Sequence, residues 1–295
     1  MRSITEAGDL KGKRVLVRVD WSDHDSFRIE NSLPTIEYLL SNGAHVVLAT
    51  HDDRGNMEDL KKFVPEGVEI LPNVRENPGE ESNSEEFAKK LAAKADIYVN
   101  EAFSESHREY ASIVGVPKFL PSYAGIRFVE EISKLSKAFN PPHPFLLLLG
   151  GAKIETKLPL VEKFLNIADE IFIGGAIAKY VSIQNPKITL PTGNLKALDA
   201  NAETIENLKL KIENSKFIVW NGPLGQYETG YTQYTNELAE ALANSHKEVI
   251  VGGGDTLASI QNLNILDKFS FVSTGGGAML DFLAKGTLPG IEALE

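Results

Sequence analysis

The stretch "VIVGGGDTLASI", Val249–Ile260, decides the fold. Its apolar, β-branched beginning predicts a buried strand, and from Asp255 on the pattern becomes typical of a helix. Three glycines separate the two, although each costs about 0.5 to 1 kcal/mol relative to alanine in a regular element. A phosphate is the obvious reason for them, because backbone N–H groups at a helix start favour an anion. The stretch therefore predicts a strand, an anion-binding turn and a helix.

The same design recurs along the chain. Further apolar runs of the second half that end in glycines are "FLLLLGGAK" (145–153), "DEIFIGGA" (169–176), "KFIVWNGPLG" (216–225) and "KFSFVSTGGGA" (268–278). In the first half, "KRVLVRVD" (13–20) precedes a helical pattern that Gly43 ends, and "AHVVLATHD" (44–52) follows it. Alternating strands and helices predict parallel sheets covered on both faces, with ligands at the carboxyl ends of the strands.

Local signals set the expected boundaries. Ser82 and Glu85 stand in the spacing of a capping box before the helical pattern that leads to "ADIYVNEAF" (95–103). The segment 125–140 reads as one helix, which "PPHP" (141–144) stops. We therefore expect a first domain over 1–124, a connecting helix over 125–140, a second domain over 141–283 and a C-terminal tail over 284–295.

Composition excludes several classes. The chain has 295 residues, a formal net charge of -11 and no cysteine, which excludes disulfides and thiolate chemistry. The charge argues against nonspecific binding to nucleic acid or acidic membranes. Neither a membrane-spanning run nor the apolar region of a signal peptide is present, so we expect a cytoplasmic protein.

Basic residues supply local anion sites. Every arginine falls within the first 127 residues. By itself this distribution fits ordinary surface charges; together with other features it would indicate a phosphate or carboxylate site in the first half. Lys153 and Lys157 stand four residues apart after a glycine turn, which would place both on one face of a helix. There they would neutralise phosphates; the alternative is that they form an ordinary solvated helix face. Asp255 beside a phosphate suggests Mg²⁺ between them, with a plain N-cap as the alternative.

Familiar nucleotide signatures do not fit these turns. A dinucleotide-binding G-x-G-x-x-G would need glycine where Leu257 stands, and no G-x-x-x-x-G-K-[ST] occurs. A dehydrogenase on a similar fold is therefore disfavoured, and the phosphates must be bound in another way.

Seven segments together resemble the phosphoglycerate kinase family, in order and along nearly the whole chain. They are "KRVLVRVD", "SLPTIEYLLSNGAHVVLATHDDRG", "VNEAFSESHREYAS", "FLLLLGGAKIETK", "IVWNGPLGQYE", "VIVGGGDT" and "FVSTGGGAML…LPGIEAL". The resemblance implies two doubly wound, Rossmann-like α/β domains joined by a helix, with the C-terminal tail returning to the first. It also implies reversible phosphoryl transfer from 1,3-bisphosphoglycerate to ADP, direct and in line, with domain closure.

Residue roles follow from the same resemblance. The first domain would bind phosphoglycerate through Asp20, Ser22, Arg28, His51, Arg54, Arg75 and Arg108. The second would bind ADP or ATP with Mg²⁺ through Gly151, Ala152, Lys157, Gly175, Asn221, Pro223, Glu228, Gly252, Gly253, Gly254, Asp255 and Thr256. Asp255 would contact the metal, and the catalytic groups would be Arg28, Lys153, Gly253, Gly254 and Gly276. The expected partners are small molecules only, and the expected state is a monomer.

Departures from the family pattern leave an alternative open. The chain is short, with losses after Trp21, after Arg54 and between Tyr180 and Lys216. Substitutions affect the sites as well: Ser22 replaces an asparagine, Glu101 an aspartate and Ala176 a glycine, while Asp52 and Asp53 place acids beside His51. The alternative is a relative that binds a phosphorylated metabolite or nucleotide but is catalytically impaired.

Overall fold

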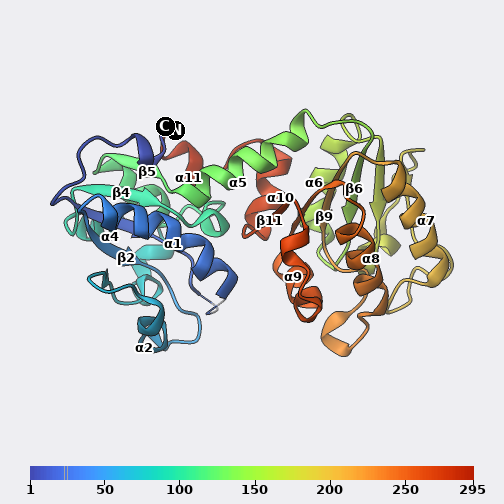
Figure 1. Ribbon diagram of the computed structural model, residues 1–295, viewed down its shortest axis with the longest axis horizontal. Helices are drawn as coiled ribbons and strands as arrows, with labels where there is room; N and C mark the ends of the chain where they lie inside the picture. Colours follow the sequence, from blue (N-terminus) through green and yellow to red (C-terminus); the bar gives the residue numbers. More distant parts are fainter. Residues whose placement is uncertain (23, 25) are drawn as a thin grey trace. The chain divides into compact units, whose positions relative to one another are not determined.

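The chain forms two compact units. The computed structural model describes residues 1–22, 24 and 26–295 (Figure 1). One unit comprises Met1–Ser133 with Thr287–Glu295, and the other comprises Lys134–Gly286. Each contains a sheet in which every strand pair is parallel, as the sequence predicted. The division falls within helix α5, Ile126–Ser136, rather than at the prolines after residue 140.

The first unit is built on a five-stranded sheet in the order β3-β2-β1-β4-β5. Its strands are β1 (Arg14–Arg18), β2 (His45–Ala49), β3 (Glu69–Ile70), β4 (Ile97–Asn100) and β5 (Ser122–Ala124). Its helices are α1 (Ser26–Ser41), α2 (Met57–Leu60), α3 (Pro78–Glu81), α4 (Glu85–Ala92), most of α5, and α11 (Pro289–Glu292). The C-terminal residues join this unit, where the Gly290 N–H donates to the Ser106 carbonyl at 2.9 Å.

Helix α4 begins differently from the expected capping box. Its N-cap is Ser84, whose hydroxyl accepts from the Phe87 N–H at 3.4 Å. The Ser82 hydroxyl instead donates to the Pro78 carbonyl at 2.9 Å, because Ser82 closes the short helix α3. The prediction of Ser82 as the cap was therefore wrong by two residues, since two serines compete for one helix start.

The second unit has a six-stranded sheet in the order β11-β10-β9-β6-β7-β8. Its strands are β6 (Phe145–Leu149), β7 (Glu170–Ile173), β8 (Ile188–Thr189), β9 (Phe217–Asn221), β10 (Glu248–Gly252) and β11 (Phe271–Ser273). Its helices are α6 (Ile154–Phe164), α7 (Ala202–Asn214), α8 (Gln233–Ala243), α9 (Gly254–Ile260) and α10 (Gly277–Lys285). The five glycine-ended runs thus all contain strands, and within the second unit only the edge strand β8 was not anticipated.

Aromatic side chains form the centre of the second unit. The ring of Phe145 packs 5.8 Å from Phe164 and 5.2 Å from Phe217, and all three are fully buried. Helix α6 packs with α10, whereas α7 packs with α8 (Figure 1). Burial of such apolar surface is the main stabilising contribution, about 25 cal/mol per Å².

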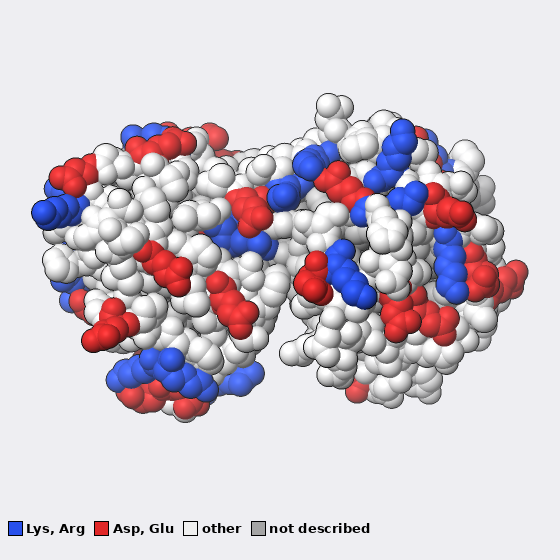
Figure 2. All heavy atoms as spheres, viewed as in Figure 1, with Lys and Arg blue, Asp and Glu red and all other residues white. Residues whose placement is uncertain are grey.

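The predicted helix over 125–140 ends early. Helix α5 stops at Ser136 and continues as a 3₁₀ turn, Lys137–Phe139, before the prolines. Across the described residues, no helix combines the length and apolar character that crossing a bilayer requires. On the face that Figure 2 shows, basic and acidic side chains are interspersed on each unit.

Candidate active site

The strand order creates a topological switch point in each unit. In the first sheet the chain runs outward from β1 to β2 and β3, then returns to the other side of β1 at β4. In the second, β6 leads to β7 and β8, and β9 returns to its other side. Loops diverge at such switch points, and ligands bind there at the carboxyl ends of the strands. The predicted residues that follow β1 and β4, and β6 and β9, therefore lie where the topology favours binding.

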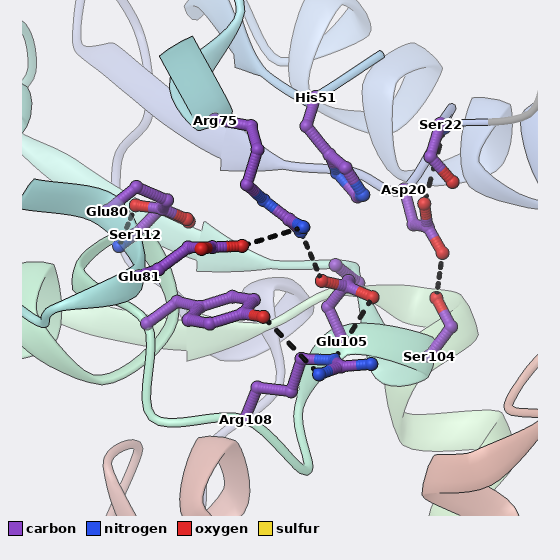
Figure 3. A network of polar contacts seen from close by, with 12 residues as sticks. Asp20, Ser22, His51, Arg75, Glu80, Glu81, Ser104, Glu105, Arg108 and Ser112 are labelled. Carbon is purple, nitrogen blue, oxygen red and sulfur yellow. Dashed lines mark hydrogen bonds and ion pairs between the residues drawn. The ribbon is translucent and has the colours of Figure 1, made fainter. Parts of the chain in front are cut away.

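Asp20 and Arg28 form an ion pair beside β1. The Arg28 Nη1 lies 2.9 Å from the Asp20 Oδ2. The same oxygen also accepts from the Ser104 hydroxyl (Figure 3). Burial alone would raise the pKa of Asp20, but the charge of Arg28 and the other donors around it outweigh burial and lower it to about 2. Asp20 is therefore ionised at neutral pH, and it orients Arg28 and Ser104.

His51, at the carboxyl end of β2, is held by a buried arginine. Its Nδ1 lies 3.2 Å from the Arg18 Nη2. Because a guanidinium only donates, Nδ1 must accept, which leaves the proton on Nε2. Burial and the charge of Arg18 lower the pKa of His51 to about 3, so the imidazole is neutral and offers one N–H donor.

Arg18 itself was missed by the sequence analysis. It is fully buried, its Nε donates to the Ser112 hydroxyl at 2.8 Å, and its Nη1 donates to the Val19 carbonyl. The Ser112 hydroxyl and backbone N–H in turn donate to the buried carboxylate of Glu80. The available signal was an arginine directly after the apolar residues 15–17 of β1, since a buried charge requires partners.

Arg75 and Arg108 are brought together by an acidic residue. The Arg75 Nη2 lies 3.0 Å from the Glu105 Oε2, and the Arg108 Nε lies 3.9 Å from Glu105 Oε1. The guanidiniums of Arg75 and Arg108 lie 4.8 and 5.7 Å from the centre of the Tyr110 ring. Glu105 was not predicted as a site residue, although it stands three positions before Arg108.

The two remaining predicted residues of this unit are Arg54, in the loop after β2, and Ser22, in the segment after β1. Arg54 is exposed there. The Asp52 carboxylate accepts from the backbone N–H groups of Arg54 and Asn56, each at 2.8 Å. It therefore stabilises its own loop. Ser22 is buried, with its N–H donating to Asp20 at 3.3 Å.

In the second unit, glycines let three turns meet at the ends of β6, β7 and β9. A Cβ on Gly222, which has φ +103°, would lie 2.3 Å from the Gly150 carbonyl carbon. A Cβ on Gly175 would lie 2.6 Å from the Gly151 nitrogen. Only glycine permits such close approach, so these turns form one compact floor beside Pro223.

The two lysines do not share a helix face. Lys153 is the exposed N-cap of α6 and lies outside its helical backbone, whereas Lys157 is buried within the helix. The expectation of one common face was therefore wrong, because the helix begins only at Ile154. Burial, with the nearby charge of Lys153, lowers the pKa of Lys157 to about 8 against the opposing effect of Asp255. Lys157 lies beside Gly151, since a Cβ added to Gly151 would lie 3.1 Å from the Lys157 Nζ.

The glycines of the opening stretch form the turn before α9. Gly253 is the N-cap, with φ +105°, and Asp255 lies in the first turn, so it is not the cap that the alternative reading required. Gly276 precedes α10 in the same way, with φ +47°. The Thr256 hydroxyl accepts from the Gly222 N–H at 2.7 Å, and the buried Asn221 lies next to it at the end of β9.

A cavity of about 490 Å³ opens over this floor. Predicted nucleotide-binding residues that line it are Gly151, Ala152, Pro223, Glu228 and Asp255. Side chains that were not predicted complete the wall, among them Lys179, Leu195, Leu198 and Tyr227. The Tyr227 hydroxyl donates to the Asp255 carboxylate at 3.5 Å. The cavity is large enough for a small ligand.

One carboxylate on the wall fits a magnesium ion that arrives with a nucleotide. No group of three or more His, Asp or Glu side chains in the described part of the chain could hold a metal by itself. Mg²⁺ is commonly bound by one or two carboxylates together with substrate phosphates, so the exposed Asp255 meets this requirement.

These features define a class: a two-unit parallel α/β protein with clustered arginines in one unit and a glycine-floored pocket in the other. The family model for phosphoglycerate kinase matches residues 4–66, 55–189 and 178–286. The chain therefore belongs to the phosphoglycerate kinase family, and it is a kinase.

Individual relatives agree with this assignment. The chain is 35% identical to the phosphoglycerate kinase of Dictyoglomus turgidum, covering 97% of this chain and 96% of that one. It is 34% identical to that of Coprothermobacter proteolyticus, covering 100% and 98%. These alignments run over 382 and 388 positions against 295 residues here, so parts of each relative have no counterpart in this chain.

Solved structures give the same result. The phosphoglycerate kinase of Pyrococcus horikoshii matches with a TM-score of 0.86 at 27% identity, covering 100% of this chain and 98% of that one. That of Coxiella burnetii matches with a TM-score of 0.80 at 29% identity, covering 99% and 98%. The shortening has therefore left the fold intact.

Proposed function

We propose that this shortened chain retains full catalytic machinery and transfers the phosphoryl group directly between its two ligands. The reaction is the reversible phosphoryl transfer between 1,3-bisphosphoglycerate and ADP, giving 3-phosphoglycerate and ATP, in glycolysis. The ion pair of Arg28 with Asp20, 2.9 Å apart, supports this most strongly, because it presents a cation at the carboxyl end of β1. An impaired relative has no need to retain such a pair.

In the first unit, each side chain has a distinct task. The Nε2–H of His51 donates to the glycerate, and Asp20 accepts from its hydroxyl group. Arg75, Arg108 and Arg54 hold its phosphate, for which the planar guanidinium offers paired donors. Ser22 lies beside Asp20 and contributes a further polar contact.

In the second unit, the glycine floor and cations hold the nucleotide. Backbone N–H groups at Gly253, Gly254 and Gly276 face the phosphates at two helix starts. Lys157 lies deep beside Gly151, and Lys153 extends from the start of α6 towards solvent, where it can follow the transferred group. Asp255 would hold Mg²⁺, which neutralises charge on the nucleotide phosphates when bound.

The chemistry requires positioning rather than a covalent nucleophile. In the transition state, charge spreads over the three equatorial oxygens of the phosphoryl group. Arg28, Lys153 and the aimed N–H groups stabilise that charge most when water is excluded. We propose that closure of the units brings the ligands in line, as in other two-domain transferases. The two units act together in one monomeric, cytoplasmic chain. Its ligands are small molecules, and the net charge of -11 supports the absence of nucleic acid among its partners.

Replacing Arg28 tests the assignment. Arg28→Ala should lower kcat about a hundredfold or more while raising KM far less, since its contact is made mainly in the transition state. Arg14→Ala is the matched control, because Arg14 lies exposed at the opposite end of β1. Unchanged kcat with a raised KM would reassign Arg28 to ground-state binding.

A further inference from the structure

A carboxylate occupies the basic part of the first-unit site. Glu105, in the 3₁₀ turn after β4, bonds to Arg75 at 3.0 Å and lies 3.9 Å from Arg108. Its side chain is only 12% exposed, so this charge is not simply solvated. Figure 3 shows the carboxylate between the two guanidiniums.

We propose that Glu105 is an internal competitor for the substrate phosphate, which must displace it from Arg75 and which binds more weakly because of it. The proposal rests on the proposed role of Arg75 and Arg108 in phosphate binding. A phosphate dianion and Glu105 need the same Nη donors, and two like charges beside one guanidinium repel each other. Glu105 therefore determines the affinity of the site without contacting the reacting atoms.

A second acid separates this role from a general effect of charge. Glu81 also bonds to Arg75, at 3.2 Å through Nη1, but its side chain is 58% exposed. Water screens such a pair, so removing the charge of Glu81 should change anion affinity little. Glu81→Gln is thus a matched control, with the same arginine and the same change in net charge.

The substitution Glu105→Gln removes the charge of this side chain and keeps its shape. Its amide oxygen still accepts from Arg75, so any positioning of that arginine is preserved. Inorganic sulfate is the probe, because it remains a dianion throughout the neutral and mildly acidic range. We expect the Kd for sulfate to fall about tenfold in Glu105→Gln, less than twofold in Glu81→Gln, and the KM for 3-phosphoglycerate to follow the same order.

Proton uptake gives an independent readout. Burial raises the pKa of Glu105 against the charges of Arg18, Arg75 and Arg108, and Asp20 raises it further. Two further titratable groups lie near Arg75: the neutral His51, whose pKa the charge of Arg75 helps to lower, and the exposed Glu81. A bound dianion disfavours the charged form further, so the wild-type chain should take up protons on binding sulfate at mildly acidic pH.

The experiment is calorimetry with sulfate in buffers of different ionisation enthalpy, on the wild-type chain and both variants. Tighter binding with less proton uptake in Glu105→Gln, and neither change in Glu81→Gln, is the expected result. Weaker binding in Glu105→Gln would make Glu105 a positioning residue and overturn the proposal, as would equal effects of the two variants. If sulfate and 3-phosphoglycerate both fail to bind the wild-type chain, the proposed substrate site fails as well. Binding of both with no effect of Glu105→Gln would refute the inference alone.

Discussion

Arg18 lies 3.2 Å from His51, with its Nη2 facing Nδ1, and the pair joins the proposed substrate site to a buried carboxylate. The same guanidinium donates to Ser112, which donates to Glu80. Arg18 therefore keeps His51 in the tautomer that carries its proton on Nε2, and it compensates the charge of Glu80.

Arg18→Met should destabilise the chain by about 3 kcal/mol, because it leaves Glu80 as an uncompensated buried charge. The free energy of unfolding in urea measures this. Adding Glu80→Gln should restore part of the loss, and Arg14→Met, at the exposed start of the same strand, is the control. A single Arg18→Met variant as stable as the wild-type chain would show that the buried network contributes little.

Glu101 should make stability depend on pH. Burial raises its pKa to about 7, although Thr35 and two N–H groups at the start of α5 favour the charged form. Because the folded pKa exceeds the unfolded one, this group's contribution is fully present below about pH 4.5 and is lost as pH rises through 7. The loss amounts to about 3 kcal/mol.

Urea unfolding at pH 5 and pH 8 tests this. The Glu101→Gln variant should be less stable overall than the wild-type chain, because the amide NH2 that replaces one carboxylate oxygen cannot accept a hydrogen bond. Its stability should nevertheless fall less than that of the wild-type chain between pH 5 and pH 8. Glu109→Gln, at an exposed position nearby, should behave as the wild-type chain does. Parallel pH profiles for Glu101→Gln and the wild-type chain would contradict the expected effect.

Asp255 should bind metal rather than cap a helix. Since Gly253 is the N-cap of α9, Asp255→Asn leaves the cap intact and removes only the charge. We expect Mg²⁺-dependent ADP binding to weaken about tenfold or more, while the melting temperature changes little. Calorimetry with ADP, with and without Mg²⁺, measures this, and Asp267→Asn is the exposed control. The same Mg²⁺ dependence in both variants would exclude metal contact.

The nucleotide base should be poorly discriminated. The shortened segment places Leu195, Ala197 and Leu198 on the cavity wall, and Ala176 also lines it. Apolar side chains contact the face of any purine but do not read its hydrogen-bonding edge. We therefore expect similar kcat/KM for ADP and GDP at matched Mg²⁺. A preference for ADP above about a hundredfold, near 2.7 kcal/mol, would show that the base is read by polar groups.

Sequence patterns located the elements better than the contacts between them. The glycine-ended runs identified β6, β7, β9, β10 and β11, because burial on both faces and a turn requirement are local properties. The N-cap role of Lys153 was missed, since helix starts are uncertain by a residue or two.

Contacts between distant segments were beyond the sequence pattern. Arg18 reaches Ser112 across 94 positions, and Arg75 reaches Glu105 across 30. Such partners come together only once the order of the strands in the sheet is known. Neither the hydrophobic periodicity of one segment nor the spacing of residues within a motif contains that information. The site residues carried over from the family stay predictions until their variants are measured.

The most direct test is turnover by the wild-type chain itself. The purified protein is supplied with ATP, Mg²⁺ and 3-phosphoglycerate, and a coupled reduction of 1,3-bisphosphoglycerate reports the rate. We predict saturable turnover that requires all three components, with kcat in the ordinary enzyme range of about 1 to 10³ s⁻¹. Binding of both ligands by calorimetry, with no product above the mixture lacking protein, would contradict the account and leave a binding protein without catalysis.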